Sequence, residues 1–314
     1  MQTESIPTCQ TDHYRGQFSG KLVANTPLGV EYRSFVVELT GDGARAFAPS
    51  LAGQFVQVNC NNPSATQRAA PFLNRPFSIA SVNGDQNRCQ VEIIHNVIGP
   101  GTEKMSQIHV GAAVELVGPL GNGYTLGTDL NRPNILIGGG VGVPPLLFLA
   151  NQMVKAGFTD VILMIGLRTV TNFDQCIVND NTITDALTPA LRLAQTNKIN
   201  IKSIIATDNG DFGYNGSIVT ALDTLLSNGR VPKESDLFTC GPEGMLKAVV
   251  NVANKNAMPA QVCMEAYMAC GFGVCQSCIV STKVDIKKAA TDENLRYELV
   301  CHHGPVFDSN KLVF

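Results

Sequence analysis

The sequence predicts a multi-domain protein: an N-terminal antiparallel β-barrel, a central α/β domain with a parallel sheet, and a small C-terminal domain rich in cysteine. Two changes of pattern along the 314 residues predict this class. Short β-rich runs give way, from about Arg132, to alternating strand-like and helix-like segments, and cysteines cluster from about Met258 onward. We expect a flexible tail over 1–16, the barrel over 17–128, the α/β domain over 129–258 and the cysteine-rich domain over 259–314.

The expected barrel rests on short runs rich in Val, Phe and Ile that Gly, Pro and Asn separate. This pattern is typical of a small antiparallel barrel or sandwich. The runs cover residues 20–25, 33–40, 54–59, 77–82, 89–95 and 112–119.

The central region alternates between apolar strands and amphipathic helices, which indicates βα units and a parallel sheet. The expected strands cover 134–139, 160–166, 199–207 and 235–241, and the expected helices 144–157, 218–229 and 243–256.

Composition excludes several classes of function. A net charge of -3 without a dense run of Lys or Arg gives no electrostatic basis for binding nucleic acid. The most apolar long window, Ile135–Ala150, is broken by Gly and Pro and is too short to span a bilayer. The N-terminus lacks the pattern of a signal peptide, so we expect a cytoplasmic protein whose ten cysteines are reduced, with the clustered ones serving as ligands.

Four cysteines have the spacing of a plant-type 2Fe-2S site. Cys270, Cys275 and Cys278 form C-x4-C-x2-C, and Cys301 follows after 22 intervening residues. The loop between the first three contains small residues, including Gly271 and Gly273, which allow backbone N–H groups to approach cluster sulfur.

A zinc site is the alternative, but zinc sites usually pair two short C-x2–4-C hooks, and only one is present. Neither His302 nor His303 has the spacing to replace a missing cysteine. Unliganded core cysteines are the third interpretation. The scattered cysteines are expected to be small hydrophobes or surface thiols; they are Cys9, Cys60, Cys89, Cys176 and Cys263.

A glycine turn between a strand and a helix marks a candidate nucleotide site. Gly140, Gly142 and Pro145 read G-x-G-x-x-P and direct a helix N-terminus at a phosphate, although the glycines alone would also suit a tight turn. Arg168 follows the next strand, where it would serve an adenosine phosphate or merely end the strand, so the choice between NAD and NADP stays open.

A second strand end marks where nicotinamide would lie. Cys240, Gly241 and Pro242 come directly before a helix that carries Glu243 in its first turn. Turn chemistry explains the Gly-Pro pair equally well, but ligands of such sheets bind beyond the carboxyl ends of the strands.

Nicotinamide delivers an electron pair and an iron–sulfur cluster accepts single electrons, so a converter is required, and flavin is the usual one. Arg75, Pro76, Phe77 and Ser78 place a cation and a hydroxyl on a barrel strand, where they would meet a pyrophosphate and an isoalloxazine ring. A glycine turn follows at Gly99 and Gly101, with Thr102 opening a helix, and suggests another phosphate cradle. Taken alone, His95 is more often a strand histidine with satisfied hydrogen bonds than a catalytic one.

Together these motifs resemble those of one family: the electron-transfer subunits of NAD-linked (class 1B) dihydroorotate dehydrogenase, within the ferredoxin-reductase superfamily. The resemblance runs from about Gly20 to Phe307, and MACGFGVCQSC and the ending C-x-x-G-P-V-F are its most specific parts. The motifs that carry it are RPFS, GPGT, VGPLGNGY, GGGVGVPP, CGPEGMLKAV, EAYMACGFGVCQSC and VCHHGPVF.

The resemblance implies an oxidoreductase subunit of pyrimidine biosynthesis. FAD would bind in the barrel, NAD in the middle domain and the 2Fe-2S cluster at the C-terminal end. Electrons would pass from the FMN of a dihydroorotate-oxidising partner through the cluster and FAD to NAD+, in a heterotetramer with two copies of each chain. The implied FAD contacts are Arg75–Ser78, Ile94, His95, Asn96, Gly101 and Thr102, and the implied cluster ligands are Cys270, Cys275, Cys278 and Cys301.

Four features depart from the family pattern, among them the N-terminal extension and the extra segment CNNPSATQRAAPF, and two other functions compete. The charged segment between Cys278 and Cys301 is longer than in the family, and Asn96 stands where relatives often carry a basic or aromatic residue. The competing functions are a similar subunit of a bifurcating NADH-dependent ferredoxin:NADP oxidoreductase or a hydrogenase, and a non-catalytic iron–sulfur redox sensor. No acid–base pair stands out in the sequence, so we assign no catalytic side chain.

Overall fold

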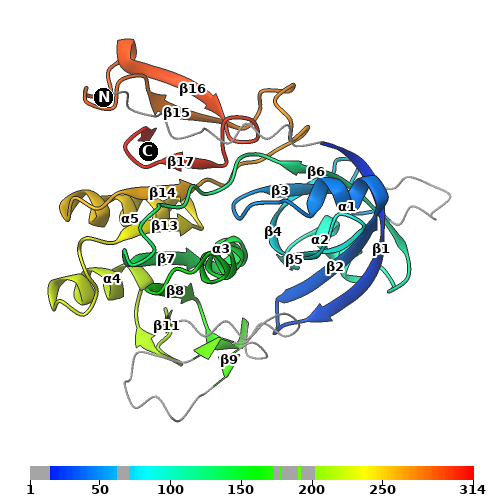
Figure 1. The fold of residues 1–314 in the computed structure, drawn as a ribbon, viewed down its shortest axis with the longest axis horizontal. Helices are drawn as coiled ribbons and strands as arrows, with labels where there is room; N and C mark the ends of the chain where they lie inside the picture. The colour runs from blue at the N-terminus through cyan, green and yellow to red at the C-terminus, as the bar shows by residue number, and fades with distance from the viewer. Residues whose placement is uncertain (1–14, 62–70, 173–176, 179–189, 192–201) are drawn as a thin grey trace.

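The computed structural model describes residues 15–61, 71–172, 177–178, 190–191 and 202–314. Most of the predicted tail, Cys9, Cys176 and the start of the strand expected over 199–207 lie outside these residues. The chain forms a barrel, a parallel-sheet domain and a C-terminal domain (Figure 1). The predicted multi-domain fold class is confirmed.

The barrel is closed and antiparallel, with strand order β1-β2-β5-β4-β3-β6. Alternate residues of β2 point inward, so Phe35, Val37 and Leu39 are almost fully buried in its core. The strands are β1 (Gly16–Pro27), β2 (Tyr32–Thr40), β3 (Phe55–Val58), β4 (Arg75–Gly84), β5 (Arg88–Asn96) and β6 (Ala113–Leu120).

Two short helices accompany the barrel. Helix α2 (Pro100–Ser106) begins at the predicted glycine turn, where Thr102 Oγ1 accepts a hydrogen bond from the Gly99 N–H. Helix α1 (Gly41–Phe47) was not predicted, because its seven residues begin with Gly-Asp-Gly and carry little helical signal. Tertiary packing stabilises it, since Phe47 is buried in the barrel core.

The middle domain has a seven-stranded sheet of order β12-β11-β8-β7-β13-β14-β17, in which only β17 runs antiparallel to its neighbour. Its strands are β7 (Asn134–Gly139), β8 (Val161–Leu167), β11 (Lys202–Thr207), β12 (Tyr214–Asn215), β13 (Asp236–Cys240), β14 (Ala260–Cys263) and β17 (Val306–Asp308). A separate pair contains β9 (Ile177–Val178) and β10 (Ala190–Leu191).

Among the described residues, three helices cover this sheet: α3 (Val143–Ala156), α4 (Ile218–Ser227) and α5 (Glu243–Lys255). Helix α3 lies between the sheet and barrel strand β4, and one continuous apolar core joins the barrel to α3 and this side of the sheet (Figure 1). Helices α4 and α5 pack over a second core. The barrel and the sheet are therefore joined through α3 in a single packed body.

The C-terminal region adds a three-stranded sheet of order β16-β15-β18. Its strands are β15 (Ile279–Lys283), β16 (Leu295–Leu299) and β18 (Leu312–Val313). The long segment between Cys278 and Cys301 is thus a β-hairpin, and its first pair, Ile279 with Leu299, brings the two cysteines together. Although we expected the C-terminal domain to begin at residue 259, β14 belongs by its pairing to the parallel sheet.

Candidate functional site

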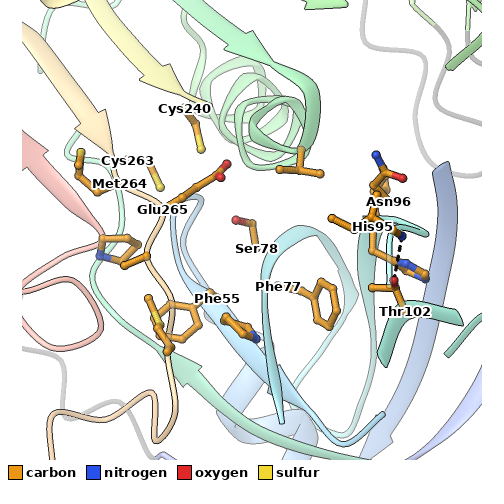
Figure 2. Close-up of a pocket in the computed structure, with 17 residues that line it drawn as sticks. Phe55, Phe77, Ser78, His95, Asn96, Thr102, Cys240, Cys263, Met264 and Glu265 are labelled. Carbon is orange, nitrogen blue, oxygen red and sulfur yellow. Dashed lines mark hydrogen bonds between the residues drawn. The ribbon is translucent and has the colours of Figure 1, made fainter. Parts of the chain in front are cut away.

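A cavity of ≈ 230 Å³ lies where the three parts of the chain meet. Barrel side chains on β4, β5 and α2 face Cys240, Cys263 and Glu265 from the carboxyl ends of β13 and β14 (Figure 2). The lining contains most of the predicted flavin contacts: Pro76, Phe77, Ser78, Ile94, His95, Asn96 and Thr102. Ligands of parallel sheets bind at this edge, and the barrel closes over it.

Two predicted flavin residues lie beside the lining rather than in it. Gly101 is buried, and a β-carbon there would lie 3.5 Å from the Arg75 side chain. One Arg75 nitrogen donates to the carbonyl of Leu73 at 3.0 Å. Arg75 and Gly101 are therefore adjacent at the end of the cavity that Thr102 lines.

Unpartnered polar atoms test whether the cavity fits a flavin. His95 is 1% exposed and packs against Phe77, with ring centroids 5.7 Å apart, yet neither ring nitrogen has a hydrogen-bond partner among the residues that the structure describes. Asn96 Oδ1 is likewise buried without a partner. Buried polar atoms are normally hydrogen-bonded. Apolar walls with a few unpaired polar atoms suit the flat, polar-edged ring system of FAD.

The electrostatics around this cavity favour neutral side chains. Burial lowers the pKa of His95 to about 4. A hydrogen bond with Cys263 and burial raise the pKa of the Cys240 thiol well above its usual value. Water reaches the Glu265 side chain, but partial desolvation by the surrounding protein raises the pKa of its carboxyl. His95 and Cys240 are therefore uncharged near neutral pH.

A second cavity, ≈ 600 Å³ in volume, adjoins the first and shares Asn96, Ile98 and Val141 with it. Gly140 lines this cavity and has a φ of 55°, a conformation that glycine adopts readily. Gly142 does not line it; a β-carbon there would clash with the carbonyl of Cys240. The glycine turn thus combines an open surface at Gly140 with close packing at Gly142.

Charged groups mark the far end of the second cavity. Arg168, which follows β8, and Asp208, which follows β11, both line it and are exposed. Of the predicted nicotinamide group, Pro242 lines this cavity, Cys240 lines the first, and Gly241 packs beneath both against Gly139. A nucleotide here would reach from Arg168 toward the flavin cavity.

The four predicted ligand cysteines form two pairs. The Cys275 N–H lies 3.4 Å from Cys270 Sγ, and the Cys301 N–H lies 3.4 Å from Cys278 Sγ. Left-handed backbone at Gly271 and Gly273, with φ values of 81° and 90°, turns the loop between them. A 2Fe-2S cluster is held by four cysteine thiolates, and the two pairs provide that number.

The thiols differ in their tendency to ionise. Hydrogen bonds from Ser277 and the Cys270 region lower the pKa of Cys275 to about 6, whereas burial and then Cys278 raise that of Cys301 to about 12. Within the described ranges, no three His, Cys, Asp or Glu side chains converge on one metal ion. His303 Nδ1 already accepts a hydrogen bond from the Leu299 N–H at 2.9 Å. The two cysteine pairs provide the four thiolate ligands that a two-iron cluster uses.

Several lining residues escaped the sequence analysis. Asp208 belongs to no motif singled out there, although it directly follows a predicted strand, and Glu265 and Met268 stand in the motif EAYMACGFGVCQSC without having been assigned a role. Cys263, expected to be a plain hydrophobe or surface thiol, lines the first cavity. Cys60 and Cys89 are buried in the barrel core. In the part of the chain that the structure describes, no helix has the length and apolar character needed to cross a membrane.

Known proteins resemble this chain both in its C-terminal domain and over nearly its whole length. Residues 265–313 match the family described as the iron–sulfur cluster binding domain of dihydroorotate dehydrogenase B. The "Dihydroorotate dehydrogenase B (NAD(+)), electron transfer subunit" of Streptococcus mutans is 31% identical over 90% of this chain and 93% of its own length. The same subunit of Streptococcus thermophilus is 33% identical, with the same coverage.

Solved structures show the same architecture. A structure of the NADH-dependent reduced ferredoxin-NADP oxidoreductase superposes with a TM-score of 0.70 at 20% identity, covering 94% of this chain and 89% of the other. The ferredoxin reductase in carbazole 1,9a-dioxygenase gives a TM-score of 0.57 at 20% identity, covering 78% and 66%. These similarities concern the fold.

The barrel, the parallel sheet and the paired cysteines together define a protein with the ferredoxin-reductase type of fold and a C-terminal iron–sulfur domain. Identities of 31% and 33% over nearly the whole chain specify it further. The chain belongs to the family of electron transfer subunits of dihydroorotate dehydrogenase B (NAD(+)). The resemblance found in the motifs is confirmed.

Proposed function

We propose that this chain passes electrons between a dihydroorotate-oxidising partner subunit and NAD+. It is an oxidoreductase subunit, and its cofactors are FAD, a 2Fe-2S cluster and NAD. One observation carries the proposal: a single cavity is lined by Ser78 of the barrel, Cys240 of the sheet and Met268 beside the cluster loop. A flavin there would touch the nicotinamide side and the cluster side at once.

The protein's task at this site is to bind and orient. When bound, FAD accepts or donates an electron pair as hydride and single electrons in turn. Phe77 and Ile94 would hold the ring, and His95 and Asn96 would hydrogen-bond its polar edge. The proposed cofactor-binding residues are Arg75, Pro76, Phe77, Ser78, Ile94, His95, Asn96, Gly101, Thr102, Gly140, Gly142, Cys240 and Gly241, of which Gly142 and Gly241 would shape the turns rather than line a cavity. The proposed cluster ligands are Cys270, Cys275, Cys278 and Cys301.

No acid–base pair would be required of this chain, because the bound cofactors would supply the hydride transfer and the protein would need only to fix their distance. The neutral His95 and Cys240 support this assignment, since they add no charge beside the ring. Packing of the barrel against α3 fixes the separation of the two sides of the cavity. Substrate oxidation would take place in the partner.

The partner would dock over the cluster loop. Tyr267, Phe272 and Val274 project from this loop with 98%, 51% and 74% of their surface exposed, an apolar group typical of an interaction site. We propose an FMN-containing catalytic subunit, with two copies of each chain in the assembly. The cytoplasmic location stays a prediction.

Anaerobic copurification tests the function. The complex isolated with this chain should reduce NAD+ when given dihydroorotate, and its companion should contain FMN. If FAD and the cluster are present but ferredoxin or hydrogen replaces dihydroorotate as the electron donor, a different partner is correct. A preparation with no releasable flavin would instead indicate the redox sensor.

A further inference from the structure

Gln57 is a buried side chain whose polar atoms lack partners. It lies in the middle of β3 and is 1% exposed, yet neither Nε2 nor Oε1 has a hydrogen-bond partner among the described residues. Leaving a buried amide unpaired destabilises the folded protein, and an apolar residue of similar size would avoid that cost. Its presence therefore points to a partner outside the polypeptide.

The nearby Gln54 shows what a satisfied amide looks like in this barrel. It is equally buried, but its Oε1 accepts from the Leu51 N–H at 2.9 Å and its Nε2 donates to the Gly121 carbonyl at 3.0 Å. Local packing therefore allows buried glutamines near β3 to find protein partners. Gln57 differs from Gln54 because its side chain faces the cysteine loop and has no hydrogen-bond partner among the described residues.

Gln57 faces the loop that carries the predicted cluster ligands. A β-carbon added at Gly271, next to Cys270, would lie 2.8 Å from Gln57 Nε2. Phe55, two residues away on the same strand face, packs in the core that contains Cys278 and Cys301. The glycine at 271 leaves no side chain between the amide and this loop.

Gln57 also adjoins the flavin side. In the antiparallel pairing of β3 with β4, Gln57 lies opposite Pro76, and Phe55 lies opposite Ser78. Phe55, Pro76 and Ser78 line the flavin cavity. Gln57 is therefore located between the proposed FAD contacts and the cysteine loop.

We propose that Gln57 is a positioning residue of the iron–sulfur centre, whose side-chain amide donates a hydrogen bond to the sulfur atoms held by the Cys270–Cys278 loop. This inference rests on the proposed function, because it requires the cluster at that loop. Cluster sulfur carries negative charge and accepts such bonds, and hydrogen bonds to it tune the reduction potential. Reduction adds negative charge, so a donor stabilises the reduced form more than the oxidised one.

Potentiometric titration of the complete holoprotein, followed by the EPR signal of the reduced cluster, tests this role. Gln57→Leu should shift the cluster midpoint to a more negative potential. We expect the ratio of reduced to oxidised cluster at a fixed potential to fall roughly tenfold, about 59 mV for one electron. The flavin midpoint, measured in the same titration from absorbance, should move little.

Gln54→Leu is the matched control, because it also removes a buried amide near β3. It should lower the melting temperature, since it breaks two hydrogen bonds, and leave the cluster midpoint unchanged. Gln57→Met, which keeps an unbranched chain without a donor, should reproduce the shift of Gln57→Leu and guards against misfolding of one variant. Unchanged midpoints in both Gln57 variants would overturn the proposal.

A second test measures the proposed hydrogen bond in the protein with Gln57 intact. With 15N in the side-chain amides of glutamine, pulsed EPR should detect one nitrogen coupled to the cluster, and this coupling should survive Gln276→Met in the exposed part of the loop. Loss of the coupling in Gln276→Met, or no coupling at all, contradicts the assignment to Gln57. A native protein without any cluster signal would instead refute the proposed function.

Discussion

Cys240 and Cys263 lie directly opposite each other on the parallel strands β13 and β14, and both line the cavity between the barrel and the sheet (Figure 2). Cys240 ends β13, where nicotinamide would approach the flavin. The register of two strands thus fixes the position of the Cys240 thiol beside the proposed meeting point of the two rings.

Cys240→Ala should slow the reduction of bound FAD by NADH about tenfold, because small displacements of reacting groups are costly. The KM for NADH should change little. Stopped-flow absorbance of the flavin measures the rate, and Cys89→Ala, which removes a buried thiol of the barrel, is the control. Equal rates in both variants would show that Cys240 has no part in orientation.

Cys275→Ser should separate the two halves of the electron path. Removing one thiolate should prevent assembly of the 2Fe-2S cluster, whereas the flavin cavity does not include Cys275. We expect flavin reduction by NADH to persist and dihydroorotate-dependent reduction of NAD+ by the complex to be lost. Cys60→Ser, in the barrel core, should retain both activities. Parallel loss of both activities in Cys275→Ser would refute this order of carriers.

His95 should make the protein less stable in mild acid. Its pKa is about 4 in the folded chain and about 6.5 when unfolded, so between these values the unfolded state binds more protons. The free energy of unfolding should fall as the pH drops from about 6.5 to 4, by about 3 kcal/mol in total. Denaturant titrations at several pH values measure this loss.

His95→Leu should flatten that dependence, and replacing the exposed His109 by Asn should leave it unchanged. A slope in His95→Leu as steep as that of the native protein would assign the effect to another group.

Gly142→Ala should destabilise the α/β domain by at least about 2 kcal/mol, because the new methyl group would clash with the carbonyl of Cys240. Gly244→Ala is the counterpart: a β-carbon there meets no atom within 4 Å, and helix α5 favours alanine. Its melting temperature should stay level or rise slightly. A tolerated Gly142→Ala would mean that the turn can move away from β13.

The elements with strong local patterns were predictable from the sequence. Five of the β-rich runs begin or end within a few residues of β2 to β6, and the helices expected over 144–157 and 243–256 match α3 and α5. Helix α1 and the short strand β17 were missed, because seven and three residues carry too little periodicity. Their stability comes from tertiary contacts.

The site was predictable where a motif carries it and obscure where the fold brings residues together. Ser78 and the four cysteines stand in recognisable spacings. Asp208 enters the second cavity only because parallel strands end at a common edge, and Glu265 stands in a quoted motif that assigned it no role. No sequence pattern pointed to Gln57, since its proposed role depends on the pairing of β3 with β4 and on the approach of Gly271.

The position of β17 has a consequence for the fate of chains that lack iron. Asn122 holds β17 by two hydrogen bonds of 2.9 Å to Val306, and β17 covers β14, which would otherwise be the edge of the sheet. Open edges with unpaired backbone groups recruit strands from other molecules. β17 begins five residues after Cys301, so a cluster bound to this cysteine would also restrain the strand that closes the edge. We therefore expect iron starvation to promote aggregation of this subunit as well as loss of its electron transfer.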